Sequence, residues 1–298
     1  MEKNGKKMTA FILLSFIMLI GSIFIIYLGS KIVVYSAGWL ASCLKMQKVI
    51  VGSVFVASVT SLPELLSSIF AVFFGTSNMA FGNIIGSNIY NIPLIVGICG
   101  LIGEYKIKNC SVGKECLFMI SLAAIMTGLI VSTGMVTWWI GAVFLALYPM
   151  FIFYSVRKGN GFSSYKPVKN KAKLMVSMLG GGAALLGGTF LLVYSIINIT
   201  EAYGLMYFYT GLTVMALGCI VPETAVSISA ALRGEQEISI GNVIGDNLIT
   251  MTLGFGVIGL IKPFTVSLSE VLYTMPFMIL ITFILYVMSK SHKITRRW

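Results

Sequence analysis

Gly82-Asn83-Ile84-Ile85-Gly86-Ser87-Asn88 recurs 159 positions later as Gly241-Asn242-Val243-Ile244-Gly245-Asp246-Asn247. The dipeptide Pro63-Glu64 recurs at the same offset as Pro222-Glu223. A shift of the chain by 159 positions, without any gap, aligns residues 52–102 with 211–261, and 18 of these 51 positions are identical. The matches include Gly, Pro, Glu and Asn, whereas two unrelated apolar helices would share mainly Leu and Val. The recurrence indicates two copies of one structural unit.

The composition predicts a membrane protein. The chain has 298 residues, of which 57% are hydrophobic and 10% are charged, and a soluble fold of this length needs more charge to cover its surface. A membrane-spanning helix needs roughly 20 apolar residues. Apolar runs of sufficient length lie at about 9–40, 48–75, 79–103, 116–133, 135–156, 173–200, 207–232, 238–261 and 268–289. The predicted fold class is an all-α polytopic membrane protein with about nine transmembrane helices.

The basic residues indicate membrane topology. A net charge of +11 can suggest nucleic-acid binding, but here the basic residues lie in short loops between apolar runs and not on one exposed helix face. With the N-terminus outside, 16 of the 21 basic residues fall on the inside and four on the outside, with Lys31 inside the first run. The positive-inside rule therefore favours a cytoplasmic C-terminus. The lipid bilayer is an expected partner, and nucleic acid is not.

The repeat and the topology together define two halves of opposite orientation. Residues 1–156 form the first half, with its repeat at about 48–103, and residues 173–298 form the second, with its repeat at about 207–261. Residues 157–172 are a basic cytoplasmic linker. Five predicted spans precede this linker, so the second copy enters the membrane from the opposite side. Inverted repeats of this kind place the substrate near the midplane, where interrupted helices of the two copies meet.

Three acidic residues lie well inside apolar runs: Glu64, Glu223 and Asp246. An intramembrane carboxylate costs roughly 2.5–3.5 kcal/mol on the scale derived from insertion experiments. A neutral carboxyl hydrogen-bonded to a neighbouring helix explains one such residue, but two glutamates at matched repeat positions favour a functional site. Each glutamate follows a proline, which withholds a hydrogen bond from the carbonyl four residues back. Carbonyls beside carboxylates suit calcium and sodium, although a kink that serves packing alone is the alternative.

The two Gly-Asn segments add polar groups near these acids. Glycines four apart let helices approach closely, and we assign them to packing. Ser87 and Asn91 are four residues apart, as are Asp246 and Thr250. Residues at this spacing lie on one face of a helix. We therefore expect these four side chains to face the cation site.

The combination of Thr60-Ser61-Leu62-Pro63-Glu64 with Gly82 to Asn91, repeated in the second half, resembles the alpha-repeats of the sodium/calcium exchanger family in the cation/calcium exchanger superfamily. The resemblance covers nearly the whole chain. It implies ten helices in two inverted halves, one more than the runs counted above, and calcium and sodium as transported ions. It also implies cation ligands at Glu64, Glu223, Thr60, Ser61, Ser87 and Asn91.

The second repeat departs from the family pattern at two places. The family usually has Thr-Ser-x-Pro-Glu where this chain has Cys219-Ile220-Val221-Pro222-Glu223, so a thiol and an apolar side chain replace two hydroxyls. The backbone carbonyl of Cys219 can still serve as a ligand. The family usually has Ser followed four residues later by Asp or Asn, whereas this chain has Asp246 and then Thr250. The acid is therefore displaced by one helical turn, about 5.4 Å.

The sequence favours a secondary active cation antiporter, with sodium/calcium exchange by alternating access as the first choice. The first and sixth runs are expected to slide across a core made by the second, third, seventh and eighth. A calcium or other cation/proton exchanger is the alternative, because the lost hydroxyls concern sodium and Asp246 can accept a proton. A non-transporting protein for cation sensing or assembly is a second alternative.

An enzyme is not expected, because Ser61 has no intramembrane His or Lys partner, and no cofactor motif is present. The absence of a large insertion in the central linker favours the cell membrane of a prokaryote.

Overall fold

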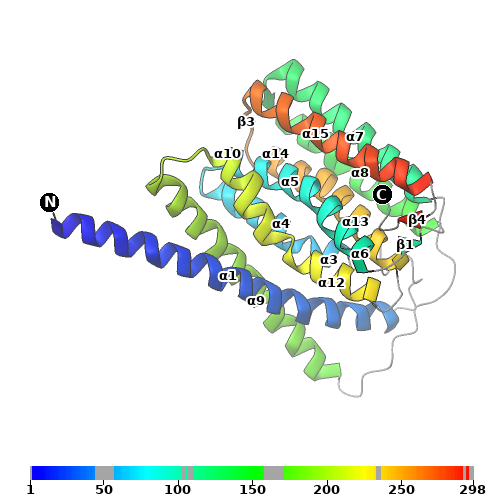
Figure 1. Cartoon of the computed structure of the whole chain (residues 1–298), viewed down its shortest axis with the longest axis horizontal. Coiled ribbons are helices and arrows are strands. Elements are labelled where there is room, and N and C mark those ends of the chain that lie inside the picture. The colour runs from blue at the N-terminus through cyan, green and yellow to red at the C-terminus, as the bar shows by residue number, and fades with distance from the viewer. Residues whose placement is uncertain are drawn as a thin grey trace.

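The computed structural model describes residues 2–43, 57–102, 105–106, 111–157, 171–232, 236–290 and 293–294. Almost all of these residues are helical (Figure 1). Six helices among them are long and apolar enough to cross a membrane, and the bent pair Tyr207–Cys219 and Val221–Leu232 makes a seventh. Two shorter apolar helices cover Ala57–Phe73 and Trp138–Phe153. Each of the nine predicted runs overlaps one of these stretches, although residues 48–56 of the second run lie outside the described residues. The polytopic helical fold is confirmed. The number of nine membrane spans stays a prediction.

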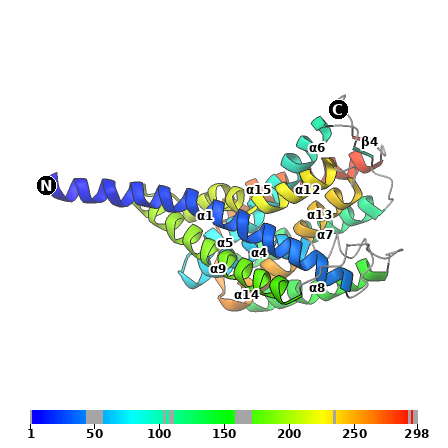
Figure 2. The same cartoon turned by 90° about the horizontal axis from the view of Figure 1, so that it is seen from below.

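Two long helices lie side by side at one edge of the molecule. They are α1 (Glu2–Cys43) and α9 (Lys171–Ala202), and Figure 2 shows the N-terminal part of α1 projecting beyond the rest of the chain. Glycines bring their backbones together. A Cβ atom on Gly29 would lie 3.0 Å from the Gly181 carbonyl oxygen, and one on Gly181 would lie 3.1 Å from the Gly29 carbonyl oxygen. Small residues at a membrane helix interface permit this approach.

The two repeats form the centre of the molecule (Figure 1). The first repeat consists of α3 (Ala57–Thr60), α4 (Leu62–Phe73), α5 (Ser77–Asn91), the π-helical turn η2 (Ile92–Val96) and α6 (Gly97–Ile102). The second repeat consists of α10 (Tyr207–Thr210), the π-helical turn η3 (Gly211–Met215), α11 (Ala216–Cys219), α12 (Val221–Leu232), α13 (Gln236–Ile249), the π-helical turn η4 (Thr250–Gly254) and α14 (Phe255–Ile261). Residues 44–56, which contain the predicted start of the first repeat, lie outside the described residues.

The helix breaks before the two glutamates have the same backbone geometry. α3 and α4 are separated at Ser61, which has φ −72° and ψ −3°. α11 and α12 are separated at Ile220, which has φ −74° and ψ −1°. Pro63 and Pro222 occupy the second position of the helix that follows. Proline fits there, because the first turn of a helix has no intrahelical acceptor for its N–H groups.

The helix that follows each break is held by equivalent hydrogen bonds. The Asn83 side-chain amide donates to the Ser68 hydroxyl at 2.9 Å, and the Asn242 amide donates to the Ser227 hydroxyl at 3.0 Å. These pairs are related by the offset of 159 positions. The repeat read from the sequence is therefore a structural repeat as well.

The glycines of α5 serve packing between the repeats. α5 packs against α10 and η3. A Cβ atom on Gly82 would collide with the Phe208 carbonyl oxygen, and one on Gly86 with the Leu212 carbonyl oxygen. The assignment of these two glycines to packing is thus confirmed, and the close approach places the site residues of α5 next to the second repeat.

The remaining helices flank this core. They are α7 (Ser111–Thr133), α8 (Trp138–Arg157) and α15 (Leu268–Lys290). α7 packs on α15, and α8 packs on α14. The linker predicted at 157–172 falls largely on 158–170, outside the described residues, and the division into halves stays a prediction at its boundaries.

Four two-residue strands form two antiparallel pairs, and each pair joins a strand of the first half to a strand of the second half. β1 (Tyr105–Lys106) pairs with β4 (Lys293–Ile294), and β2 (Met135–Val136) pairs with β3 (Phe264–Thr265). β1 and β3 are separated by the repeat offset of 159, and β2 and β4 by one position less. Each half therefore contributes one strand to each pair.

Candidate ion-binding site

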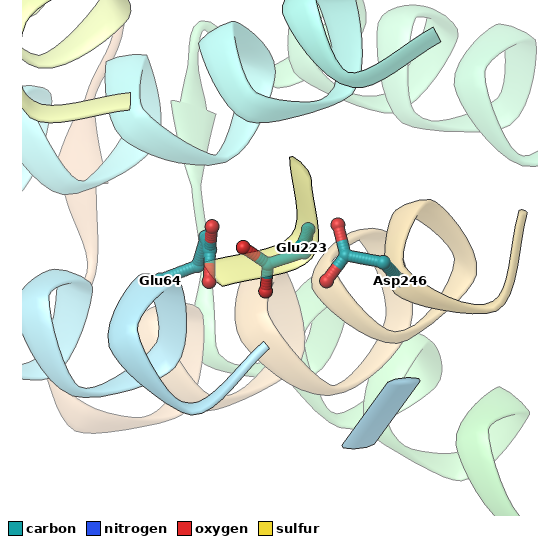
Figure 3. A group of neighbouring side chains, drawn as sticks. All are labelled: Glu64, Glu223 and Asp246. Atoms are coloured by element: carbon teal, nitrogen blue, oxygen red, sulfur yellow. The ribbon is translucent and has the colours of Figure 1, made fainter. Parts of the chain in front are cut away.

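Three buried carboxylates meet at the centre of the molecule (Figure 3). Glu64 lies in the first turn of α4, Glu223 in the first turn of α12, and Asp246 on α13. Each offers one carboxylate oxygen, and the three atoms lie within 4.8 Å of one another. All three residues are 0% exposed. The structure thus brings together the three acids that the sequence singled out as intramembrane.

The two glutamates lack hydrogen-bond partners. All four of their carboxylate oxygens are buried, and none accepts or donates a hydrogen bond within the described part of the chain. A buried charge without a partner is strongly unfavourable. A carboxylate pair of this kind requires a cation or protons between its oxygens. Oxygen ligands with negative charge are those that calcium prefers.

Asp246 differs from the glutamates because the first repeat holds it in place. Its Oδ1 atom accepts a hydrogen bond from the Ser61 hydroxyl, and its Oδ2 atom accepts one from the Asn91 side-chain amide. These bonds join α13 to the α3–α4 break and to the end of α5. The Asn91 Oδ1 atom is buried without a hydrogen-bond partner in the described residues. Two residues expected as cation ligands therefore contact the displaced acid.

The break in the first repeat also carries Thr60. The Thr60 hydroxyl lies 3.2 Å from the Ala57 carbonyl oxygen and 3.3 Å from Asn242 Oδ1, and it can donate to either. Ser61 similarly reaches the Ala57 carbonyl oxygen at 2.7 Å. Thr60 is 0% exposed and Ser61 is 1% exposed. Both hydroxyls thus line the contact between α3 and α13, which carries Asp246.

Cys219 is the repeat equivalent of Thr60 and contacts the opposite half. Its Sγ atom lies 3.2 Å from the Ser67 Oγ atom and 3.7 Å from the Pro63 carbonyl oxygen. Cys219 is 0% exposed. The thiol therefore lies against the first turn of α4, beside the residue that precedes Glu64.

Ser87 and Thr250 are buried, and their hydroxyls form hydrogen bonds with groups other than the carboxylates. The Ser87 hydroxyl donates to the Ile84 carbonyl oxygen of its own helix at 3.0 Å. Thr250 reaches the Asp246 backbone carbonyl oxygen at 3.0 Å and accepts a bond from the Asn88 amide at 2.8 Å. Both are buried. Neither has a side-chain hydrogen bond to a carboxylate among those found in the described residues.

Several side chains that surround the site were not named as site residues from the sequence. The Asn83 amide reaches the Glu64 backbone carbonyl oxygen at 3.2 Å, and Ser67 reaches the same oxygen at 3.1 Å. The Asn247 amide donates to the Asn88 carbonyl oxygen at 3.3 Å. Identity across the repeats gives a signal for the asparagines. Ser67 has no such signal, because Val226 replaces it in the second repeat.

Comparison with known proteins gives a consistent result. The family model described as "Sodium/calcium exchanger protein" matches residues 14–157 and 173–296. The sodium/calcium exchanger MaX1 of Methanosarcina acetivorans is 27% identical and aligns over 95% of this chain and 93% of that protein. The inner membrane protein YrbG of Escherichia coli is 26% identical over 83% of this chain and 79% of that protein.

The fold is similar to that of a solved exchanger. A structure of the sodium-calcium exchanger NCX_Mj, soaked with Na⁺ and no Ca²⁺, matches with a TM-score of 0.69. The sequence identity is 25%, and the match covers 96% of this chain and 94% of the other. The agreement extends over both repeats and the flanking helices.

Proposed function

The chain belongs to the sodium/calcium exchanger family, and on that premise we propose that it is a secondary active antiporter that exchanges sodium for calcium by alternating access. Family membership makes it a multi-pass membrane exchanger, and the similarity to MaX1 and NCX_Mj supports sodium and calcium as the ions. The observation that carries the proposal is the pair of buried glutamates, whose four carboxylate oxygens have no hydrogen-bond partner within the described residues.

We assign Glu64 and Glu223 as the central ligands of calcium. They come from opposite repeats, so a cation between them contacts both halves at once. Asp246 adds a third negative charge within 4.8 Å, and the Asn91 Oδ1 atom is an available neutral oxygen. Ser61 and Thr60 supply hydroxyl oxygens on the side of the first repeat. Ser87, Thr250 and the backbone carbonyl of Cys219 complete the proposed set of site residues.

Alternating access requires that the site opens to one side at a time. The pair of α1 and α9 is the candidate moving unit, because these helices pack along each other through glycines and lie at the edge of the core (Figure 1). α9 contacts α4, and α1 contacts α12, so the pair touches the glutamate-bearing helix of each repeat. Movement of the pair along these helices would expose the site from either side in turn.

We propose the cell inner membrane as the location, with the N-terminus outside and the C-terminus in the cytoplasm. The name of the relative from Escherichia coli places that protein in the inner membrane, and the distribution of basic residues supports the orientation.

The test is calcium-45 uptake into proteoliposomes made with the full chain. Vesicles loaded with sodium and diluted into sodium-free buffer should accumulate calcium, and vesicles with only an imposed proton gradient should not. The double variant Glu64→Gln/Glu223→Gln should abolish uptake. The matched control is Glu201→Gln, which removes the charge of an exposed glutamate that accepts a hydrogen bond from Tyr207 outside the site.

Each outcome decides between the candidates. Uptake with the proton gradient alone would replace sodium by protons as the driving ion. A lack of uptake under both gradients, with folded protein in sealed vesicles, would reject calcium exchange and leave cation sensing or assembly.

A further inference from the structure

The Asn83 side chain holds the turn of helix that carries Glu64. Its Nδ2 atom lies 3.2 Å from the Glu64 backbone carbonyl oxygen, 3.2 Å from the Ser67 hydroxyl and 2.9 Å from the Ser68 hydroxyl. A carbonyl oxygen can only accept a hydrogen bond, so the nitrogen of the Asn83 amide must face α4. The Ser67 hydroxyl donates to the same carbonyl oxygen at 3.1 Å. Two side chains therefore fix the backbone at Glu64.

Asn83 can act as an anchor because α5 is itself fixed against the second repeat. Gly82 directly precedes Asn83, and a Cβ atom on Gly82 would collide with the Phe208 carbonyl oxygen. Asn91 lies eight residues further along α5 than Asn83, and its side-chain amide donates to Asp246. One closely packed helix thus holds two of the three acids of the site.

Glu223 has no corresponding support. The asparagine of the second repeat, Asn242, donates its amide to the Ser227 hydroxyl at 3.0 Å. Among the hydrogen bonds found in the described residues, none joins a side chain to the Glu223 backbone carbonyl oxygen. Val226 occupies the repeat position of Ser67 and has no hydroxyl. The Asn–Ser bond is therefore common to both halves, whereas the described residues show bonds to the glutamate backbone in the first half alone.

Support from the backbone matters because the Glu64 carboxylate is not held by hydrogen bonds of its own. Both of its oxygens are buried, and neither has a hydrogen-bond partner in the part of the chain that the structure describes. A side chain that becomes ordered at a cation loses conformational entropy, and a fixed backbone leaves less of that freedom to lose. Groups that orient a metal ligand in this way typically change metal affinity by about 10–100-fold.

We propose that Asn83 and Ser67 are positioning residues, which hold Glu64 at the cation and thereby raise the affinity for calcium. This inference rests on the proposed function in taking Glu64 as a calcium ligand. Glu223, whose backbone lacks these bonds, is then the ligand that adjusts its position when the cation enters. The two halves contribute one fixed glutamate and one adjustable glutamate.

The hydroxyl of Ser67 is tested with two substitutions of the same shape. Ser67→Thr keeps a hydroxyl and Ser67→Val removes it, so the effect of the added methyl group is common to both. Calcium-45 binding to the purified full chain gives the dissociation constant, which should be about threefold to tenfold higher in Ser67→Val than in Ser67→Thr. Ser67→Ala, which removes the hydroxyl without added bulk, replaces Ser67→Val in a comparison with the wild type if the larger side chains prevent folding.

The larger effect is expected from Asn83→Leu, which has a similar shape and no donor. The dissociation constant for calcium should rise at least about tenfold. The matched control is Ser227→Ala, which removes the Asn–Ser bond of the second half and should change the constant less than about twofold. Thermal unfolding without calcium measures the stability of each variant. Lower melting temperatures with unchanged calcium binding in Asn83→Leu and Ser67→Val would show a merely structural role and would overturn the proposal.

Transport gives a readout that altered packing alone would not move. A positioning residue acts on affinity, so Ser67→Val should raise the calcium concentration for half-maximal uptake by the same factor as the dissociation constant. The maximal rate of uptake should stay within about twofold of that in Ser67→Thr. A fall in the maximal rate with an unchanged half-maximal concentration would contradict positioning.

Binding and transport together separate this inference from the proposed function. Equal calcium binding by Ser67→Val and Ser67→Thr, with calcium uptake intact, would overturn the inference while calcium exchange stands. Calcium binding that depends on the Ser67 hydroxyl, in a chain without calcium uptake, would support the inference and reject the exchange function. A wild-type chain that binds no calcium would overturn both.

Discussion

Ser61 and Ile220 occupy the same position in the two halves, and their backbone dihedral angles differ by only 2° in φ and in ψ. Their side chains have opposite chemistry. The Ser61 hydroxyl donates to Asp246, whereas Ile220 has no polar side-chain atom. The same contrast holds one residue earlier, where Thr60 is matched by Cys219. The two halves share a backbone at the site and differ in what they offer a cation.

The comparison separates the features that the two halves share from those that differ between them. A helix break followed by Pro and Glu is present in both halves, and so are the Asn–Ser bonds that fix the next helix. These features set the geometry. The hydroxyls, the thiol and the displaced acid vary around that geometry, so they are the positions at which ion preference can change without a change of fold.

The largest expected effect concerns a feature that the halves share. Glu64→Gln and Glu223→Gln should each reduce calcium-45 uptake more than about 100-fold, since each removes a charged ligand, and even groups that only support a ligand are typically worth 10–100-fold. Equal losses would show that both halves hold the cation. If one of the two variants retained uptake near the wild-type rate, that glutamate would not be an essential ligand of calcium.

The second prediction concerns packing outside the site. Gly97 and Gly256 are repeat equivalents, but a Cβ atom on Gly256 would lie 2.7 Å from the Leu145 backbone nitrogen, whereas Gly97 has no atom within 4 Å. Gly256→Ala should therefore destabilise the chain by about 1–3 kcal/mol through overpacking. Gly97→Ala should be neutral or slightly stabilising, because alanine favours helix by about 1 kcal/mol over glycine.

Thermal unfolding in detergent, followed by size-exclusion chromatography, measures both variants. Equal melting temperatures would contradict the contact between α14 and α8.

The third prediction compares Asp246 with its equivalent, Ser87. Asp246→Asn removes the charge that accepts bonds from Ser61 and Asn91, and hydrogen bonds to charged groups contribute about 1.5–3 kcal/mol. We expect the calcium concentration for half-maximal uptake to rise about tenfold or more, since 1.4 kcal/mol corresponds to a factor of ten. Ser87→Ala should raise it less, by about threefold at most, because Ser87 is a neutral ligand of the proposed site whose hydroxyl also bonds within its own helix, and a neutral polar interaction adds only about 0.5–1.5 kcal/mol. An effect at Ser87 as large as that at Asp246 would contradict the ranking of the charged ligand above the neutral one.

The smallest effect is expected from restoring a hydroxyl to the second half. Ile220→Ser gives the second half the serine that the first half has at Ser61. We expect the sodium concentration for half-maximal calcium uptake to fall about threefold, which corresponds to one modest polar interaction. The measurement is the sodium dependence of calcium-45 uptake at fixed calcium. Ser61→Ala is the reciprocal change and should raise that concentration. An unchanged sodium dependence in both variants would show that these positions do not contribute to sodium-driven uptake.

The sequence singled out three intramembrane acids, two of them at matched repeat positions. Glu64, Glu223 and Asp246 were identified because a carboxylate inside an apolar run is energetically costly unless it has a function. In the structure, one carboxylate oxygen of each residue lies within 4.8 Å of the others. The helix breaks followed from the prolines. Within the described residues the nine apolar runs all overlap helical stretches, because hydrophobicity and length determine a membrane helix almost alone.

The remaining contacts depend on how the halves face each other, which spacing within one half does not determine. A spacing of four put Ser87 and Thr250 on the same faces as Asn91 and Asp246. The structure adds that the Ser87 hydroxyl donates to the Ile84 carbonyl oxygen and that the Asn88 amide donates to the Thr250 hydroxyl, and the roles of Ser87 and Thr250 at the cation stay a prediction. Ser67 could not be found from the repeat, because its importance arises from contacts with Cys219 and Asn83.

The exchanged strands have a consequence for the ancestry of the chain. β1 of the first half pairs with β4 of the second, and β3 of the second pairs with β2 of the first. A single half would have both of its strands unpaired, and a second copy inserted upside down would satisfy both. The two pairings are therefore of the kind that two copies of one half could form with each other. Duplication of one half would supply both pairings at once, because β3 repeats β1 at the offset of 159 and β4 repeats β2 one position short of it.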